Sequence, residues 1–223
     1  MKIKIVETDD GSHSLFIREL DESYHSMFGA VNESNHVFIN AGLNILPNTI
    51  KIINLLEIGF GTGLNALLTF LNCKKKQTRV NYYSIEPYPL LSEIYEQLNY
   101  PEILGKRNIR EIFIQMHKSE WNTEVNLNKY FSLKKMKEKL ESINLPSDFY
   151  HLVYFDAFAP DVNPELWVQD IFDKIYVSMI TDGVFVTYSA KGAVRRNLQK
   201  SGFRVERIPG PKGKREMLRA VKT

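Results

Sequence analysis

The chain has 223 residues, 43% of them hydrophobic and 25% charged, with a formal net charge of +3. This composition excludes fibrous and disordered classes and suits one large domain, or one domain with a small appendage. Cys73 is the one cysteine, which excludes an intramolecular disulfide, and no stretch approaches the length of a membrane span. We expect a cytoplasmic protein with no membrane contact and no metal site.

The sequence pattern of residues 1–50 differs from that of the remainder, and we interpret these residues as an N-terminal extension. The apolar stretches IKIVET and SLFIREL flank Asp9-Asp10-Gly11, a tight-turn signal that predicts a hairpin. The spacing of apolar residues after position 30 predicts a helix that ends near Gly42. We expect this extension to pack on a main domain formed by residues 51–223.

From residue 51 onward, apolar runs that suit buried strands alternate with stretches of helical periodicity. The predicted strands are residues 51–58, 80–86, 128–136, 150–158, 183–190, 203–208 and 216–222. The predicted helices are residues 63–71, 89–98, 107–119, 163–179 and 191–202. This alternation predicts an α/β fold: a mostly parallel twisted sheet with helices on both faces, closed by an antiparallel C-terminal hairpin.

A glycine-rich loop joins the first predicted strand of the main domain to its helix. Residues 57–63 read EIGFGTG, whereas the dinucleotide fingerprint needs a glycine five positions after Gly59, where Leu64 stands. An anionic Glu57 would repel a diphosphate and would suit a cationic ligand such as S-adenosylmethionine. The loop resembles the first motif of Rossmann-like methyltransferases. The alternative is a structural strand-to-helix turn.

Two further carboxylates are predicted at the same edge of the sheet, where doubly wound folds hold their ligands. Glu86 ends the second strand and can accept both hydroxyls of a ribose. Asp156 follows the apolar run YHLVYF and can orient an amine and take up its proton. A helix cap is the alternative for Asp156. The common position with Glu57 and Glu86 favours a functional role.

The C-terminal segment is basic. Residues 191–223 contain 11 Lys/Arg against 2 Asp/Glu, a net charge of +9, whereas residues 1–190 contain 18 against 24, a net charge of −6. Lys212, Lys214 and Arg215 precede the last predicted strand, so this loop is a candidate for phosphate contacts with a nucleic acid. A solvated basic surface is the alternative.

Four stretches together resemble the methyltransferase part of the bacterial enzymes that complete 5-methylaminomethyl-2-thiouridine at the wobble position of tRNA. They are ESYHSMFGAVNESNHVFINAGL, LLEIGFGTGLNALL, YFDAFAPDVNPELW and SAKGAVRRNLQKSGFRVERIPGPKGKREML. The resemblance implies a Rossmann-like class I methyltransferase. It also implies transfer of a methyl group from S-adenosylmethionine to the amine of 5-aminomethyl-(2-thio)uridine in the tRNA anticodon loop.

The resemblance also assigns expected site residues. Asp156 would face the target amine as the catalytic residue. The cofactor would be held by Glu57, Gly59, Phe60, Gly61, Thr62, Gly63, Asn65, Glu86 and Asp156. The substrate would contact Tyr24, His25, Phe158, Lys212, Lys214 and Arg215. Structural roles are the alternative for the three aromatic residues.

Two features of the sequence depart from the family pattern. Some relatives carry a second, flavin-dependent oxidase domain, and this sequence has no second dinucleotide fingerprint, so we expect it to act on the aminomethyl form or beside a separate oxidase. Relatives often place an acidic residue near the adenine after the third strand, and Glu138 is the nearest candidate. The rival functions are an aminopropyl transferase, a non-catalytic RNA-binding module and, less favoured, a nicotinamide oxidoreductase.

Overall fold

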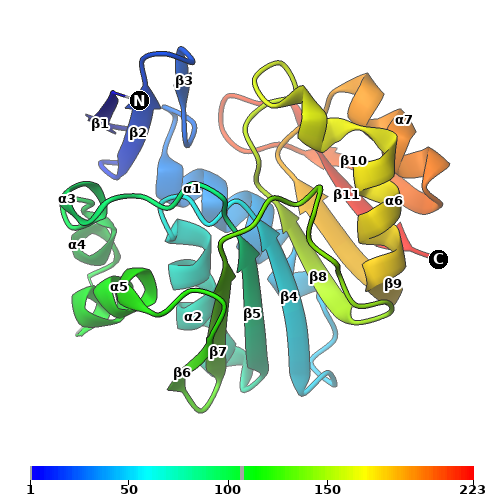
Figure 1. Cartoon of the computed structure of the whole chain (residues 1–223), viewed down its shortest axis with the longest axis horizontal. Helices are drawn as coiled ribbons and strands as arrows, with labels where there is room; N and C mark the ends of the chain where they lie inside the picture. Colours follow the sequence, from blue (N-terminus) through cyan, green and yellow to red (C-terminus); the bar gives the residue numbers. More distant parts are fainter. Residues whose placement is uncertain (1, 106–107) are drawn as a thin grey trace.

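The structure is a computed structural model that describes residues 2–105 and 108–223. Its centre is an eight-stranded sheet in the order β10-β11-β9-β8-β4-β5-β7-β6 (Figure 1). The strands are β4 (Ile52–Ile58), β5 (Arg79–Ile85), β6 (Glu124–Asn128), β7 (Phe131–Met136), β8 (Tyr150–Phe155), β9 (Met179–Thr187), β10 (Phe203–Pro209) and β11 (Glu216–Lys222). Strands β4, β5, β7, β8 and β9 pair in parallel, and β10 and β11 form the predicted antiparallel hairpin.

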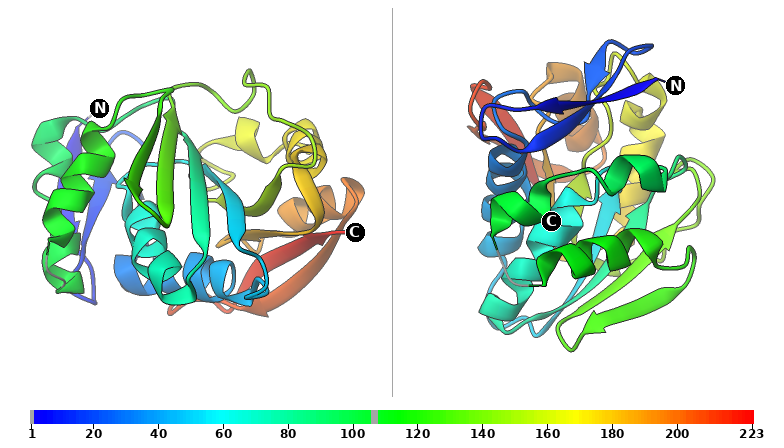
Figure 2. Two further views of the ribbon diagram at one scale, coloured as in Figure 1. Left: turned by 90° about the horizontal axis from the view of Figure 1, so that it is seen from below. Right: turned by 90° about the vertical axis from the view of Figure 1, so that its left-hand side faces the viewer.

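Helices cover both faces of this sheet, as Figure 1 and the left view of Figure 2 show. One core cluster holds Leu55 and Tyr154, and a second holds the adjacent Leu56 and Phe155. Successive side chains of a strand point to opposite faces, so both faces of these strands are buried. The helices are α1 (Ala30–Ser34), α2 (Leu64–Lys76), α3 (Ser92–Tyr95), α4 (Tyr100–Leu104), α5 (Ile109–Lys118), α6 (Gln169–Ser178) and α7 (Gly192–Lys200).

The N-terminal hairpin is confirmed as β1 (Ile3–Glu7) and β2 (His13–Ile17), to which the short β3 (Glu22–Ser23) adds. The helix predicted after it consists of α1 and the π-helical η1 (Asn35–Asn40), followed by the 3₁₀ turn η2 (Leu43–Ile45). Side chains of α1 and η1 belong to the same core cluster as β4 and β8. The domain boundary at residue 50 stays a prediction.

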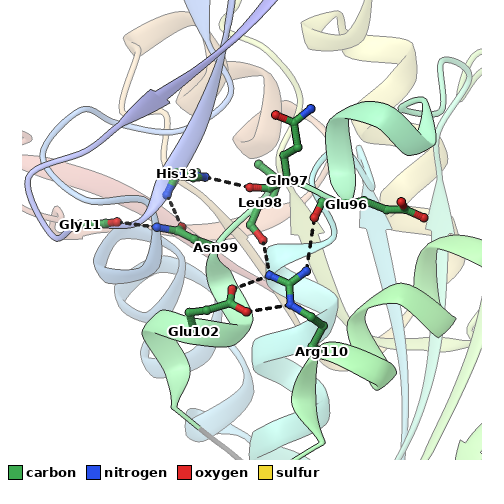
Figure 3. A network of polar contacts seen from close by, with 8 residues as sticks. All are labelled: Gly11, His13, Glu96, Gln97, Leu98, Asn99, Glu102 and Arg110. Carbon is green, nitrogen blue, oxygen red and sulfur yellow. Dashed lines mark hydrogen bonds and ion pairs between the residues drawn. The ribbon is translucent and has the colours of Figure 1, made fainter.

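A polar network ties the hairpin to the segment before α5 (Figure 3). The Asn99 side chain donates a hydrogen bond to the Gly11 carbonyl at 2.8 Å and accepts one from the His13 N–H at 2.8 Å. The Arg110 guanidinium pairs with both carboxylate oxygens of Glu102. The β1–β2 turn is therefore fixed against a part of the chain about 88 residues away.

Two predicted helices were wrong in detail, and one strand was missed. The helix expected at residues 89–98 is only one turn long, because Asn99 leaves the helix to bond the hairpin and Pro101 begins the next one. Residues 163–179 divide into the 3₁₀ turn η3 (Pro164–Trp167) and α6, since the Trp167 carbonyl accepts a hydrogen bond from the Asn197 side chain instead. Strand β6 was not predicted.

Among the residues that the structure describes, no helix is both long enough and apolar enough to cross a membrane.

Candidate active site

The carboxyl ends of three neighbouring strands are joined by hydrogen bonds just beyond the regular ladders. The Gly59 N–H donates to the Ile85 carbonyl at 2.9 Å, and the Asp156 N–H donates to the Ile58 carbonyl at 3.1 Å. These bonds fix the loops that follow β4, β5 and β8 relative to one another. The carboxylates predicted at this edge are therefore attached to backbone whose relative position is fixed.

The loop between β4 and α2 requires glycine at two closely packed positions. Gly59 has a φ of +91°, and a Cβ atom there would lie 2.9 Å from the Asp156 carbonyl oxygen. Gly61 has a φ of +46° and faces the ring of Tyr24. Only glycine combines these φ angles with so little space, so the loop backbone is bare toward the ligand edge.

Glu86 lies where the sequence predicts it, at the end of β5 beside the glycine loop. Its Oε2 accepts a hydrogen bond from the Gly61 N–H at 3.0 Å, and its Oε1 accepts one from the Tyr88 N–H at 2.7 Å. Burial raises the pKa of Glu86, and the two backbone hydrogen bonds oppose this effect. Each oxygen keeps a lone pair that can accept a hydroxyl group.

A cavity of about 630 Å³ opens at this edge between the small sheet and the main sheet. Most of the predicted site residues line it: Tyr24, His25, Gly59, Phe60, Gly61, Thr62, Asn65, Glu86, Asp156, Phe158 and Lys214. Four others do not line this cavity: Glu57, Gly63, Lys212 and Arg215. Glu138 is exposed and also lies outside the lining, whereas Lys139, Leu140 and Glu141 contribute to it.

Asp156 is held by one strong contact inside this cavity. The Asn65 side-chain N–H donates to its Oδ2 at 2.7 Å. Burial raises the pKa of Asp156 to about 7, the hydrogen bond from Asn65 opposes this shift, and the charges of Glu33 and Lys214 act in opposite directions. A carboxyl group with this pKa can both accept and release a proton at neutral pH.

Glu33 and Tyr188 also line the cavity and were missed by the sequence reasoning. The Lys214 ammonium donates to Glu33 Oε1 at 2.8 Å and lies 4.0 Å from the centroid of the Tyr188 ring. Glu33 Oε2 accepts the Ser26 N–H at 2.8 Å. Tyr188 follows the carboxyl end of β9, the same signal that identified Asp156, whereas Glu33 in α1 carries no comparable signal.

Glu57 lies beneath the glycine loop and is fully buried. Its Oε2 accepts a hydrogen bond from the Ser84 hydroxyl at 2.7 Å. Burial raises the pKa of Glu57 to about 8, despite that hydrogen bond. The carboxyl group is therefore largely neutral at pH 7, and the expectation that its negative charge faces the ligand is not supported. A direct contact with the cofactor stays a prediction.

The buried His25 connects the N-terminal region to the glycine loop. Its Nε2 lies 2.8 Å from the Thr62 hydroxyl oxygen. Burial lowers the pKa of His25 to about 4, although the nearby carboxylates of Glu33 and Asp10 oppose the shift. His25 is thus neutral at pH 7 and acts as a hydrogen-bonding contact rather than a charge.

Two aromatic rings enclose one side of the cavity. The rings of Tyr24 and Phe158 pack edge to face, with their centroids 5.0 Å apart. This contact joins the segment after β3 to the loop after β8, so that both predicted aromatic residues shape the same wall.

Two of the predicted basic residues are exposed beside the cavity. Lys212 forms an ion pair with Asp9 at 3.0 Å, and Arg215 lines a shallow depression next to Lys191. Within residues 2–105 and 108–223, no cluster of His, Cys, Asp and Glu side chains could hold a metal ion.

The residues present fit S-adenosylmethionine. The Asn65 Oδ1 is buried without a hydrogen-bond partner among the described residues, so it can accept one from a ligand ammonium. Glu86 offers acceptors for ribose hydroxyls at the end of β5. The cavity volume of about 630 Å³ is within the range of small-molecule sites.

A mostly parallel sheet of this order, with the glycine loop after β4 and a carboxylate after β5, defines a Rossmann-like class I methyltransferase. The model of a family described as S-adenosyl-L-methionine-dependent methyltransferases matches residues 104–223. This match covers more than half of the chain, and the chain belongs to that family. Its methyl donor is S-adenosylmethionine.

Several relatives carry the name tRNA 5-methylaminomethyl-2-thiouridine biosynthesis bifunctional protein MnmC. The protein of Idiomarina loihiensis is 29% identical over 225 residues, covering 89% of this chain and 35% of the relative. The protein of Azoarcus is 31% identical over 210 residues, covering 88% of this chain and 32% of the relative. The chain thus spans about a third of the length of these relatives.

Solved structures give the same fold. The crystal structure of MnmC2 from Aquifex aeolicus is 28% identical, has a TM-score of 0.78, and is covered for 71% of its length by the whole of this chain. The methyltransferase domain of the citrinin polyketide synthase is 13% identical with a TM-score of 0.50, and supports the fold alone.

Proposed function

We propose that this methyltransferase acts on the amine of 5-aminomethyl-(2-thio)uridine at the wobble position of tRNA and produces 5-methylaminomethyl-(2-thio)uridine. The observation that carries the proposal is Asp156, a carboxyl group with a pKa of about 7 in the same cavity as the glycine loop. The two relatives cover 88% or more of this chain, and their names, which refer to tRNA 5-methylaminomethyl-2-thiouridine biosynthesis, support the proposed substrate class.

The amine must lose its proton before it can attack. An ammonium that enters the cavity donates a hydrogen bond to the ionised Asp156, which takes the proton and aligns the nitrogen lone pair. Asn65 holds the carboxylate through its 2.7 Å hydrogen bond. When bound, S-adenosylmethionine would supply the methyl group, and S-adenosylhomocysteine would be the second product. One C–N bond forms, one C–S bond breaks, and the proton passes through Asp156 to solvent.

Other residues of the cavity have supporting roles in this proposal. Tyr24 and Phe158 exclude water from the uridine, while the neutral His25 steadies the glycine loop. Glu86 accepts the ribose hydroxyls of the cofactor. Lys212 and Arg215 contact phosphates of the anticodon loop. Lys214 contacts the target nucleotide from inside the cavity, because it lines the cavity wall.

The proposal also covers the cellular setting. Residues 1–50 serve as a substrate-binding extension on a methyltransferase domain of residues 51–223. The enzyme acts in the cytoplasm on tRNA that already carries a free aminomethyl group, so a separate oxidase activity precedes it wherever the uridine first carries a carboxymethylaminomethyl group.

Methyl-labelled S-adenosylmethionine and bulk tRNA from cells that lack this activity test the proposal. After incubation the tRNA is digested, and the labelled nucleoside is identified by mass spectrometry. The expected result is label in 5-methylaminomethyl-(2-thio)uridine. Label in another nucleoside, or none on tRNA that carries the free aminomethyl group, would overturn the substrate assignment.

A further inference from the structure

Phe28 is an exposed aromatic residue at the rim of the cavity that the proposed reaction does not use. Its side chain is 47% exposed, although the two residues before it, Ser26 and Met27, line the cavity wall. Met27 beside it is also 46% exposed, so the two residues form an exposed apolar patch at the rim of the cavity, which favours a binding role.

The ring of Phe28 rests on bare backbone on one side. A Cβ atom at Gly213 would lie 2.1 Å from the nearest ring carbon of Phe28, and Gly213 has a φ of +87°. A side chain at position 213 would therefore displace the ring. The ring therefore packs against the Gly213 backbone, while 47% of the residue stays exposed.

The segment that presents Phe28 is held by backbone hydrogen bonds. The Met27 carbonyl accepts the Asp9 N–H at 2.9 Å, and the Gly29 N–H donates to the Ser26 carbonyl at 3.2 Å. The Phe28 N–H donates to the Ser26 hydroxyl at 3.2 Å. A segment held in this way loses little backbone entropy when a ligand covers it.

Basic side chains of one loop favour an anionic partner. The Lys212 ammonium lies 5.8 Å from the Phe28 ring centroid and also pairs with Asp9, and the exposed Arg215 follows in the same loop. An aromatic surface beside exposed cations matches a single-stranded nucleic acid, in which bases stack and phosphates pair with basic side chains. An acidic protein partner would engage the cations but has no need of the flat ring.

We propose that Phe28, supported by Gly213, is the platform on which a base adjacent to the target uridine stacks. The inference rests on the proposed tRNA substrate and adds the residue that replaces lost base stacking. A uridine drawn into the cavity leaves its neighbour partly unstacked, and an aromatic ring at the rim compensates for that loss. Every base has a stacking face, so the contact tolerates different sequences.

The test uses full-length tRNA with 5-aminomethyluridine at the target position and measures the kinetics of methyl transfer. Phe28→Leu retains apolar volume on Gly213 but removes the aromatic face, and Phe28→Trp keeps it. We expect Leu to raise the KM for tRNA by about fivefold to 100-fold, and Trp to leave it near the wild-type value. The affinity for S-adenosylmethionine stays unchanged, and Val177→Ala, an exposed apolar residue of α6 outside the cavity lining, has no effect.

Abasic substitution identifies the stacked base independently of any folding defect. The nucleotide on the 5′ or the 3′ side of the target is replaced in turn, and one replacement is expected to raise the KM of the wild-type enzyme. In Phe28→Leu the same replacement has little further effect, because the contact is already lost.

The outcomes separate the two proposals. A wild-type enzyme that does not methylate this tRNA overturns the proposed function. A wild-type enzyme that does, with an unchanged KM in Phe28→Leu or with both abasic tRNAs, overturns the stacking platform alone. Equal KM values for tRNA in Phe28→Leu and Phe28→Trp would also contradict stacking.

Discussion

Burial has the largest effect on the pKa of Asp156, and the charge of Lys214 in the cavity wall favours the ionised form. Burial and the charge of Glu33 raise this pKa, whereas the hydrogen bond from Asn65 and the charge of Lys214 lower it. The ionised form is the one that can take a proton from the substrate. Its population therefore increases as the pH rises through about 7.

Replacing Lys214 is expected to shift the pH dependence of methyl transfer. Lys214→Met removes the favourable charge, so the pKa of Asp156 rises and the rate profile moves to higher pH. Activity then falls more at about pH 6 than at about pH 9. Initial rates measured across this range, with substrate below KM, give the shift directly.

Lys212→Met is the matched control, because Lys212 is exposed and lies outside the cavity lining. It should weaken tRNA binding without moving the profile. An equal shift in both variants, or no shift in Lys214→Met, would contradict the influence of Lys214 on Asp156.

Predictability from sequence differs sharply between individual residues of the site. Asp156 and Glu86 follow strands whose apolar runs are unmistakable, so their position at the ligand edge could be predicted. Glu33 could not, because its role depends on Lys214, 181 residues later in the chain. Glu57 was assigned a charge facing the ligand, which its complete burial does not support.

At the scale of elements, a hydrogen bond to one hydroxyl group joins the segment after β3 to the loop after β4. The Thr62 hydroxyl lies 2.8 Å from His25 Nε2, and the Thr62 carbonyl oxygen lies 3.1 Å from His117 Nε2. Burial lowers the pKa of both His25 and His117, so two neutral histidines contact the glycine loop, one from an earlier and one from a later part of the chain.

Removal of that hydroxyl is expected to loosen the cofactor loop. Thr62→Val keeps the volume but leaves His25 without this partner, at a cost of about 1 kcal/mol in the free energy of unfolding. The Kd for S-adenosylmethionine should rise about threefold to tenfold, as measured by titration calorimetry.

Two variants control for a general loss of stability. Thr62→Ser retains the hydroxyl and should bind cofactor like the wild type. Thr78→Val removes another buried hydroxyl, one that bonds the Ile50 carbonyl outside the cavity, and should lower stability without changing the Kd. A similar Kd change in Thr78→Val would show that the effect is not specific to the loop.

The elements found from the sequence are those whose signal is local. Strands β4 and β8 are continuous apolar runs because both of their faces are buried, and this pattern is visible without any other part of the chain. Strand β6 lies at the edge of the sheet and is partly exposed. Its sequence, EVNLN, mixes polar and apolar residues in a way that loops also show. The breaks around α3 and α6 depend on Asn99 and Trp167, whose partners are distant in sequence.

At the scale of the whole molecule, the basic C-terminal segment is less positive toward solvent than its composition suggests. Six of its cations pair with carboxylates: Lys191, Arg207, Lys212, Lys214, Arg219 and Lys222. The exposed pairs among them contribute little stability and can exchange partners with phosphates, whereas Glu33 and Lys222 are largely buried in their pairs. Glu206 and Glu216 are already included in the segment's net charge of +9, whereas the other four partners, Asp9, Glu33, Asp148 and Asp161, lie outside it. This net charge therefore overstates the field that a nucleic acid meets.

We expect the salt dependence of tRNA binding to depend on phosphate contacts made by the cations next to the cavity, and not on cations elsewhere on the surface. The double variant Lys212→Gln with Arg215→Gln should weaken binding and reduce the slope of log K against log salt by about 1.4, from two lost phosphate contacts on a single strand. The same changes at Lys51 and Lys75, exposed at the opposite end of the sheet, serve as the control. An unchanged slope in the first variant would show that this loop is a solvated basic surface that does not contact the tRNA phosphates.

The most direct test of the proposed role of Asp156 is a comparison of cofactor binding and methyl transfer in the Asp156→Asn variant. The asparagine keeps the shape of the side chain and an oxygen that can accept the hydrogen bond from Asn65, but it cannot take up a proton. We expect titration calorimetry to give a nearly unchanged Kd for S-adenosylmethionine. Single-turnover methyl transfer to aminomethylated tRNA should slow by about 10²-fold to 10⁴-fold. A transfer rate close to that of the wild type would contradict the central claim that Asp156 prepares the amine.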